Sequence, residues 1–153
     1  MVYIRVKRIN KQPYAYLVEN ISTKNGPRQK VKKYLGRIYD YKKNDQDDQS
    51  IIAKTKQEFI KNLVVKQLQN HGFKTKDNHS MQDKVSFSLN DLQFNTGVLA
   101  INEGYLCNHT IQQLLEFRKS KDLTKDAHVL AKNFLLAGLP VSKEEFVDFY
   151  QLL

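Results

Sequence analysis

The sequence is short of three things that mark large classes of protein: cysteine, long apolar runs and the loops of familiar enzymes. Its only cysteine, Cys107, cannot form an internal disulfide, which suits a reducing intracellular compartment. No apolar run approaches the roughly 20 residues that a membrane-spanning helix needs. The start of the chain alternates apolar and basic residues, whereas a signal peptide has an unbroken apolar stretch. We therefore expect a soluble, cytoplasmic protein that does not enter membranes.

Motifs of the common enzyme classes are also missing. There is no Walker loop, no glycine-rich dinucleotide turn and no Gly-x-Ser-x-Gly elbow. As a nucleophile, Cys107 would need a nearby base, and only His109 is close in sequence. The candidate metal ligands are His71, His79, Cys107 and His109, but a single residue separates Cys107 from His109 where a zinc knuckle has two to four. We expect no catalytic residues, no metal and no other cofactor, and we predict that the protein is not an enzyme.

The densest group of carboxylates consists of Asp45, Asp47 and Asp48. As an EF-hand calcium loop, this segment would need a glycine at the position of Ser50 and a bidentate glutamate at the position of Lys56. Because neither requirement is met, we interpret residues 44–50 as a polar linker.

Acidic residues are scarce at the amino-terminal end, which makes the charge distribution uneven. Residues 1–43 contain twelve Lys and Arg residues but only Glu19 and Asp40 as acids, a net charge of +10. The other 110 residues contain 13 basic and 14 acidic residues, a net charge of −1. One short segment therefore carries the whole excess of positive charge, and it favours a polyanion as partner.

The same segment has the pattern of a three-stranded antiparallel β-meander. Residues 2–9 alternate strictly between two faces, and residues 14–21 are apolar on both faces, as a central strand should be. Residues 28–35 form a third run, which Gly36 is predicted to close. We therefore predict a basic β-meander at 1–43.

Two groups of turn-forming residues separate these three runs. The first extends from Asn10 to Pro13, since proline ends a strand ladder and asparagine tolerates turn geometry. The second covers residues 22–27, and its Asn25-Gly26 pair is a strong hairpin signal.

Beyond the linker, residues 51–153 are predicted to be mainly helical with one short strand, so the fold class is α+β. Helical spacing of apolar residues covers 51–71, 110–119 and 124–137. Gly72 suits the position after a helix end, and Ser142 with Glu145 forms a capping box before a last helix. Residues 74–83 are interpreted as a loop. The strand at 85–89 is expected to pair with Phe73 or with the meander.

Alternation across the meander predicts two faces with different chemistry. The face toward the core is expected to hold Val2, Ile4, Val6, Leu17, Ile21, Val31 and Leu35. The opposite face is expected to bind nucleic acid through Arg5, Lys7, Tyr14, Tyr16, Arg28, Lys30, Lys32, Tyr34 and Arg37, with Tyr3 beside them. Lysine and arginine release counterions from phosphates, and tyrosine rings stack on bases. In the alternative interpretation, Tyr14, Tyr16 and Tyr34 cover hydrophobic core and the cations keep an edge strand in solution.

Four short pieces of this segment resemble a known family when taken in order: Ile4–Lys7, Leu17–Glu19, Gly26–Gln29 and Tyr34–Arg37. Together they are similar to the amino-terminal segment of IS1634-type (IS4-like) transposases and to the start of several uncharacterised archaeal proteins. The resemblance covers about a quarter of the chain, residues 3–38. It implies a nucleic-acid-facing role for Arg5, Lys7, Arg28, Lys30 and Arg37.

The catalytic part of those transposases has no counterpart here. Residues 44–153 are too few for a DDE nuclease core, which needs about 200 residues on grounds of domain size. Transposition chemistry is therefore not implied.

The carboxy-terminal helices permit a second kind of DNA contact, because the spacing of 110–119 and 124–137 fits a helix-turn-helix. The second of these helices offers Lys125, His128, Lys132 and Asn133, although acidic residues lie nearby. A small helical bundle with a neutral-to-acidic surface is the plainer interpretation, and such a bundle can bind another protein. We predict a non-catalytic nucleic-acid-binding protein, with DNA favoured over RNA. The alternatives are a protein–protein adaptor and an accessory protein of RNA or the ribosome.

Overall fold

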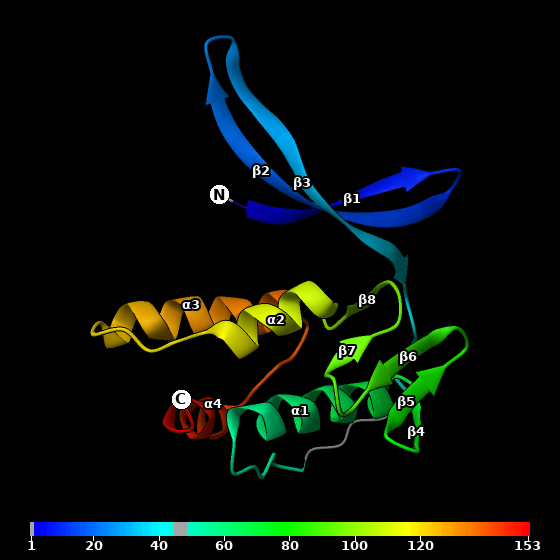
Figure 1. The fold of residues 1–153 in the computed structure, drawn as a ribbon, viewed down its shortest axis with the longest axis vertical. Helices are drawn as coiled ribbons and strands as arrows, with labels where there is room; N and C mark the ends of the chain where they lie inside the picture. The colour runs from blue at the N-terminus through cyan, green and yellow to red at the C-terminus, as the bar shows by residue number, and fades with distance from the viewer. Residues whose placement is uncertain (1, 45–48) are drawn as a thin grey trace.

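The computed structural model describes residues 2–44 and 49–153, and it has the mixed α+β architecture that the sequence predicts. Three long amino-terminal strands stand apart from a body of helices and short strands (Figure 1). These strands are β1 (Val2–Ile9), β2 (Gln12–Thr23) and β3 (Gly26–Tyr39). They pair as an antiparallel meander, as expected. The aspartates considered for calcium, Asp45, Asp47 and Asp48, lie outside the described residues.

Both turns of the meander contain only two residues. Strands β2 and β3 are therefore longer than the runs that the sequence predicted at 14–21 and 28–35. Asn10 and Lys11 both have positive φ, of 51° and 67°, which matches the right-handed twist of the strands on either side. Pro13 is not part of this turn, because it already pairs with Arg8 within β2. At the other turn, Thr23 pairs with Gly26, which has a φ of 104°.

The prediction that Gly36 closes the third strand is wrong, since β3 continues to Tyr39. The glycine is needed for a close approach of two backbones: a Cβ on Gly36 would lie 3.0 Å from Cα of Gly97. Beyond this point β3 leaves β2 and pairs in parallel with β8 (Val98–Ile101). The antiparallel meander is thus part of a mixed five-stranded sheet in the order β1-β2-β3-β8-β9, in which β9 covers Gly104–Leu106.

A second sheet of four antiparallel strands was not predicted as such. It has the order β4-β5-β6-β7, with bounds Lys74–Lys76, His79–Gln82, Val85–Ser88 and Gln93–Phe94. The predicted strand at 85–89 is confirmed as β6, but it pairs with β5 and β7 instead of Phe73 or the meander. The predicted loop at 74–83 is a hairpin, turned by Asp77 and Asn78 at positive φ.

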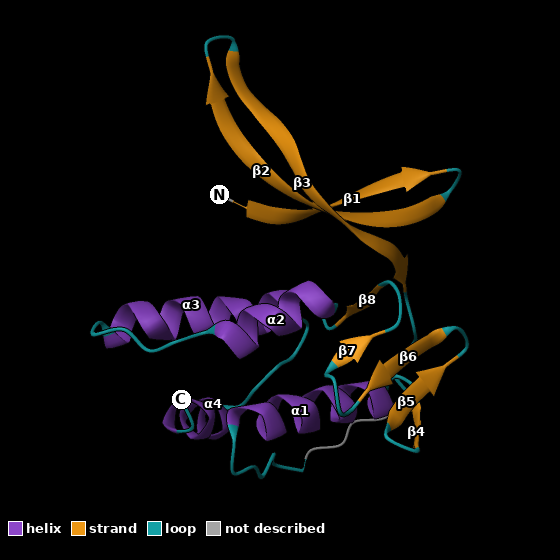
Figure 2. Cartoon of the chain, viewed as in Figure 1, coloured by secondary structure: helices purple, strands orange, loops and turns teal. Residues whose placement is uncertain are grey.

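Four helices complete the body: α1 (Lys56–Asn70), α2 (Asn108–Glu116), α3 (Leu123–Leu136) and α4 (Lys143–Gln151) (Figure 2). Helix α1 begins later than the predicted residue 51, because the Thr55 side chain caps it by accepting from the amide of Glu58. Ile52, expected on its apolar side, is 85% exposed. The caps at Gly72 and at Ser142 with Glu145 are confirmed.

The main core lies in the body, between these helices and the short strands. Its largest fully buried side chains include Phe59, Phe87, Phe134 and Phe149, and the rings of Phe59 and Phe134 both contact that of Phe149. The meander contributes Ala15 and Ile38 to a small second cluster of buried residues, which also holds Val98 and Cys107, while Tyr39 and Tyr41 pack against the edge of the main core. The body therefore holds most of the buried apolar area that stabilises the fold.

A buried carboxylate joins helices α3 and α4. Asp126 accepts hydrogen bonds from the Ser120 hydroxyl at 2.7 Å, the Ser120 amide at 2.8 Å and the Tyr150 hydroxyl at 3.1 Å. The hydrogen bond from the Ser120 hydroxyl is the largest of the causes that lower the pKa of Asp126 below its usual 3.8. Burial, followed by the bond to Asp126, raises the pKa of Tyr150.

Protonation of this carboxylate should destabilise the protein. Because the pKa of Asp126 is lower in the folded chain, its contribution is complete above the unfolded value and disappears as the pH falls through the folded value. The Asp126→Asn variant should be less stable than the wild type at pH 7, and the difference should shrink in acid. Urea unfolding across this pH range tests the prediction. Asp148→Asn, which changes an exposed carboxylate of α4, is the control. If the stability of both variants depended on pH in the same way, the prediction for Asp126 would be wrong.

Candidate nucleic-acid interface

Strand pairing divides the meander into two faces, because residues directly opposite each other in antiparallel strands point to the same side. One cross-strand row holds Lys7, Tyr14 and Arg37, and the next holds Arg5, Tyr16 and Tyr34. Tyr3 begins a third row with two valines, Val18 and Val31. The tyrosine face is the name used here for Tyr3, Arg5, Lys7, Tyr14, Tyr16, Tyr34 and Arg37. Six of the nine predicted binding residues meet on it.

The aromatic rings and cations of the tyrosine face are in mutual contact. The ring of Tyr34 lies 5.1 Å from that of Tyr16 and 6.3 Å from that of Tyr14, and Nζ of Lys7 is 5.2 Å from the Tyr16 ring centre. Tyr34 is the outermost of the three rings, at 52% exposure. Burial by its neighbours, more than their charge, raises the pKa of Tyr34, so its hydroxyl keeps its proton at neutral pH.

Side-chain hydrogen bonds hold the arginines of this face. Arg5 donates to the side-chain oxygen of Gln29, and the side-chain amide nitrogen of Gln29 donates to the Tyr3 hydroxyl. Arg37 donates to Gln12 at 2.7 Å and its guanidinium lies 5.4 Å from the ring of Tyr39. Each arginine has five donors, so both retain N–H groups for an anion.

The prediction that Arg28, Lys30 and Lys32 share this face is wrong. Arg28 pairs with Ile21 and Lys30 pairs with Glu19, which places both cations on the opposite face. The cause is a β-bulge at Lys32, which inserts one extra residue and reverses the alternation relative to Tyr34. A second bulge, at Leu35, places Arg37 on the same face as Tyr34. Lys33, which was not predicted as a site residue, also lies on the opposite face, across from Leu17.

The sequence predicted that the opposite face packs on the core along its whole length, and this prediction is wrong. Only Ile4 and Leu35 of the predicted core-facing residues pack against the small cluster at the base of the meander. Val2, Val6, Ile21 and Val31 are exposed, and Val31 lies on the tyrosine face. The meander therefore presents both faces to solvent, with cations on each.

In the part of the chain that the structure describes, carboxylates neutralise little of this charge. Among the described residues, the one ion pair joins Nζ of Lys32 to Glu19 at 3.0 Å, and this contact with Lys32 lowers the pKa of Glu19. Lys32 is thus already paired, which weakens its case as a phosphate ligand. Arg28, Lys30 and Lys33 are exposed and have no carboxylate within ion-pair distance in the described chain.

The candidate metal ligands do not come together. His71 is buried against the carbonyl of Gln67, and His79 lies on β5 beside the carbonyl of Asp77. Cys107 is buried at the start of α2 with Sγ 3.6 Å from the Thr110 hydroxyl. Within residues 2–44 and 49–153, no three His, Cys, Asp or Glu residues are grouped so as to hold a metal ion.

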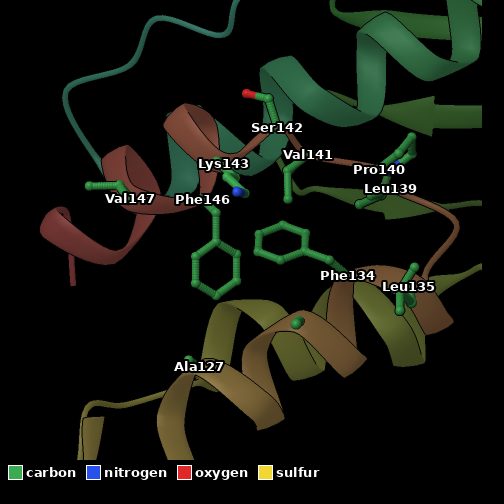
Figure 3. Close-up of a pocket in the computed structure, with 11 residues that line it drawn as sticks. Ala127, Phe134, Leu135, Leu139, Pro140, Val141, Ser142, Lys143, Phe146 and Val147 are labelled. Carbon is green, nitrogen blue, oxygen red and sulfur yellow. The ribbon is translucent and has the colours of Figure 1, made fainter. Parts of the chain in front are cut away.

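The helical half carries a groove of a different chemistry. It lies between α3 and α4, has a volume of about 570 Å³ and is lined by Phe134, Leu135, Phe146 and Val147 among others (Figure 3). Leu135, one of the apolar residues with helical spacing in 124–137, is 69% exposed at its edge. Lys143 is the one ionisable residue of the lining, so the groove has no pair of groups for acid–base chemistry.

None of the helices in the described chain is long and apolar enough to cross a membrane. Comparisons with protein-family models, with curated proteins and with solved structures found no significant match to this chain.

Proposed function

We propose that the protein binds double-stranded DNA without catalysis, through the meander. The observation that carries this proposal is the presence of cations without carboxylate partners on both faces of the three-stranded meander, which stands apart from the body (Figure 1). A flat docking surface needs charge on one face only. Charge on both faces suits a ribbon with phosphates on each side of it.

The dimensions of the hairpin support a groove as its binding site. The part of β2 and β3 beyond β1 comprises residues 20–29, which is four residues in each strand and a two-residue turn. Four residues extend about 14 Å at about 3.4 Å each. The major groove of B-DNA is about 12 Å wide and 8.5 Å deep, and it admits a two-stranded ribbon. The deep, narrow groove of A-form RNA does not, which favours DNA.

Within this arrangement the two faces have different roles. Arg28, with Lys30 next to it at the edge of the hairpin, contacts phosphates on one wall of the groove. Arg5, Lys7 and Arg37 lie on the other face toward the base of the meander and contact phosphates of the backbone outside the groove. Phosphate contacts of this kind position a protein without reading the sequence. Tyr34, the most exposed ring of the face, lies along a sugar or an accessible base.

The salt dependence of binding tests this proposal. If about five of the cations meet phosphates, the affinity for a DNA duplex should fall roughly as the fourth or fifth power of the salt concentration. Fluorescence titration of a labelled duplex, a single-stranded RNA and an acidic peptide at several salt concentrations measures this. We expect the duplex to bind most tightly and to show the steepest dependence. A flat salt dependence for the duplex would remove the proposal.

A protein–protein adaptor is the second candidate function. The observation that favours it is the mixture of exposed aliphatic side chains, Val2, Val6, Ile21 and Val31, with the cations of the meander. An acidic segment with apolar residues would match such a surface. In the same titration, tighter binding of the peptide than of the duplex would support the adaptor. Preference for the RNA would support the RNA-associated accessory role.

A further inference from the structure

A polar cavity lies at the base of the meander, where β3 passes the body. It has a volume of about 380 Å³ and is formed by three separate segments: β3 at residues 33–37, the loop at 95–97 and the start of α2 at 107–109. Lys33, Arg37 and His109 line it, and none of its lining residues is acidic. Lys33 from β3 and the imidazole of His109 from α2 thus border a space that is large enough for a phosphate group.

The body side of the cavity is held in place by hydrogen bonds and by a close contact at Gly97. The Asn108 side chain accepts from the amide of Phe94 at 2.7 Å and donates to its carbonyl at 3.1 Å. The Asn95 side chain is bonded in the same way to the amide of Ser86 and the carbonyl of Lys84. Gly97 leaves no room for a side chain, since its Cβ would be 2.6 Å from the ring of Tyr39. The wall that the body contributes is therefore formed before a ligand arrives.

The electrostatics of the cavity favour an anion. Burial, and then the charge of Lys33, lower the pKa of His109, while Glu116 acts weakly in the opposite direction. The amides of Asn108 and His109, in the first turn of α2, have no carbonyl partner within the helix and add a partial positive charge. A bound anion would relieve the repulsion between Lys33 and the imidazolium form of His109.

We propose that this cavity binds one phosphate of the DNA backbone and thereby fixes the position of the duplex along the meander. The inference rests on the proposed function, since Lys33 lies on the same face of β3 as Arg28 and Lys30. Lys33 supplies the charge, and the His109 ring donates a hydrogen bond to a phosphate oxygen. Inorganic phosphate presents the same chemistry and is the probe that separates the cavity from the rest of the surface.

Nuclear magnetic resonance of the full chain tests the phosphate site directly. Inorganic phosphate, added at constant ionic strength, should cause saturable shifts of the Asn108 and His109 amides and raise the pKa of His109. Lys33→Ala should weaken phosphate binding by about tenfold, as expected for one charge-assisted contact. The matched control is Lys32→Ala, because Lys32 is the adjacent residue and is already paired with Glu19. This variant should change the affinity for inorganic phosphate by less than about twofold. Shifts that stay linear, or an equal loss in both variants, would overturn the site.

A duplex without terminal phosphates then identifies the source of the phosphate. If the backbone occupies the cavity, the duplex should abolish the shifts that inorganic phosphate causes, and Lys33→Ala should lower the salt exponent of duplex binding by about one. A duplex that binds tightly but leaves the His109 signals unchanged would overturn this inference and leave the proposed function standing. Saturable phosphate binding with no duplex binding would overturn both the proposed function and the assignment to DNA.

Discussion

Replacement of Arg28 and Lys30 by glutamate should reduce the affinity for duplex DNA by about a hundredfold or more. Each lost charge-assisted contact is expected to weaken binding by about tenfold, and the new carboxylates repel the phosphates. The slope of log affinity against log salt should become shallower by about two, since each phosphate contact contributes about 0.9. The neutral variant Arg28→Gln/Lys30→Gln should show the same change in slope with a smaller loss of affinity.

The matched control for this prediction lies on α3, where Lys125 and Lys132 are also exposed. Reversal of both charges there should leave the affinity within about threefold if the contacts are made by the meander. An equal loss in the α3 variant would favour the helix-turn-helix interpretation instead. Because Arg28 and Lys30 make no ion pair or side-chain hydrogen bond in the described chain, their variants should keep the circular dichroism spectrum of the wild type.

Substitution of Gly104 by alanine should destabilise the protein by about 3 kcal/mol or more. Gly104 begins β9, which crosses the end of α3 so closely that a Cβ would lie 2.3 Å from the amide nitrogen of Gly138 and 2.4 Å from the carbonyl oxygen of Leu135. Backbone atoms cannot move aside as the end of a side chain can. The alanine therefore separates β9 from α3 or distorts both.

Urea unfolding followed by circular dichroism measures this effect, with Gly26→Ala as the control. Nothing lies within 4 Å of a Cβ at Gly26, so that variant should lose only the cost of a positive φ, about 1–2 kcal/mol. The comparison separates steric overlap from backbone strain. Equal losses at the two positions would contradict the overlap at the crossing of β9 and α3.

Elements that depend on neighbours in sequence were predicted well. Strand β1 and the capping box of Ser142 with Glu145 need only local alternation and local hydrogen bonds, which the sequence displays. The hairpin of β4 and β5 was missed because its strands are mostly polar and exposed, with Ser80 as its one buried residue. Its turn at Asp77-Asn78 was the signal that could have indicated it.

The candidate interface was predicted in part for a similar reason. The alternation in β1 and β2 is regular, so Arg5, Lys7, Tyr14 and Tyr16 lie together as expected. The two bulges in β3 depend on its contacts with other segments: its register with β2 and its close approach to Gly97. The sequence of one strand does not contain these contacts. The positions of Arg28 and Lys30 could therefore not be deduced from period two.

The connection between the meander and the body is narrow, and this affects how the protein can hold a partner. Strand β3 joins β8 through just two residue pairs, Ile38 with Val98 and Tyr39 with Leu99, beside the small cluster around Ala15. So few buried contacts give the joint little resistance to bending, and the hairpin can adjust its inclination to a curved surface. Fixing that inclination costs conformational entropy, so part of the free energy of any complex must offset the stiffening of this pivot.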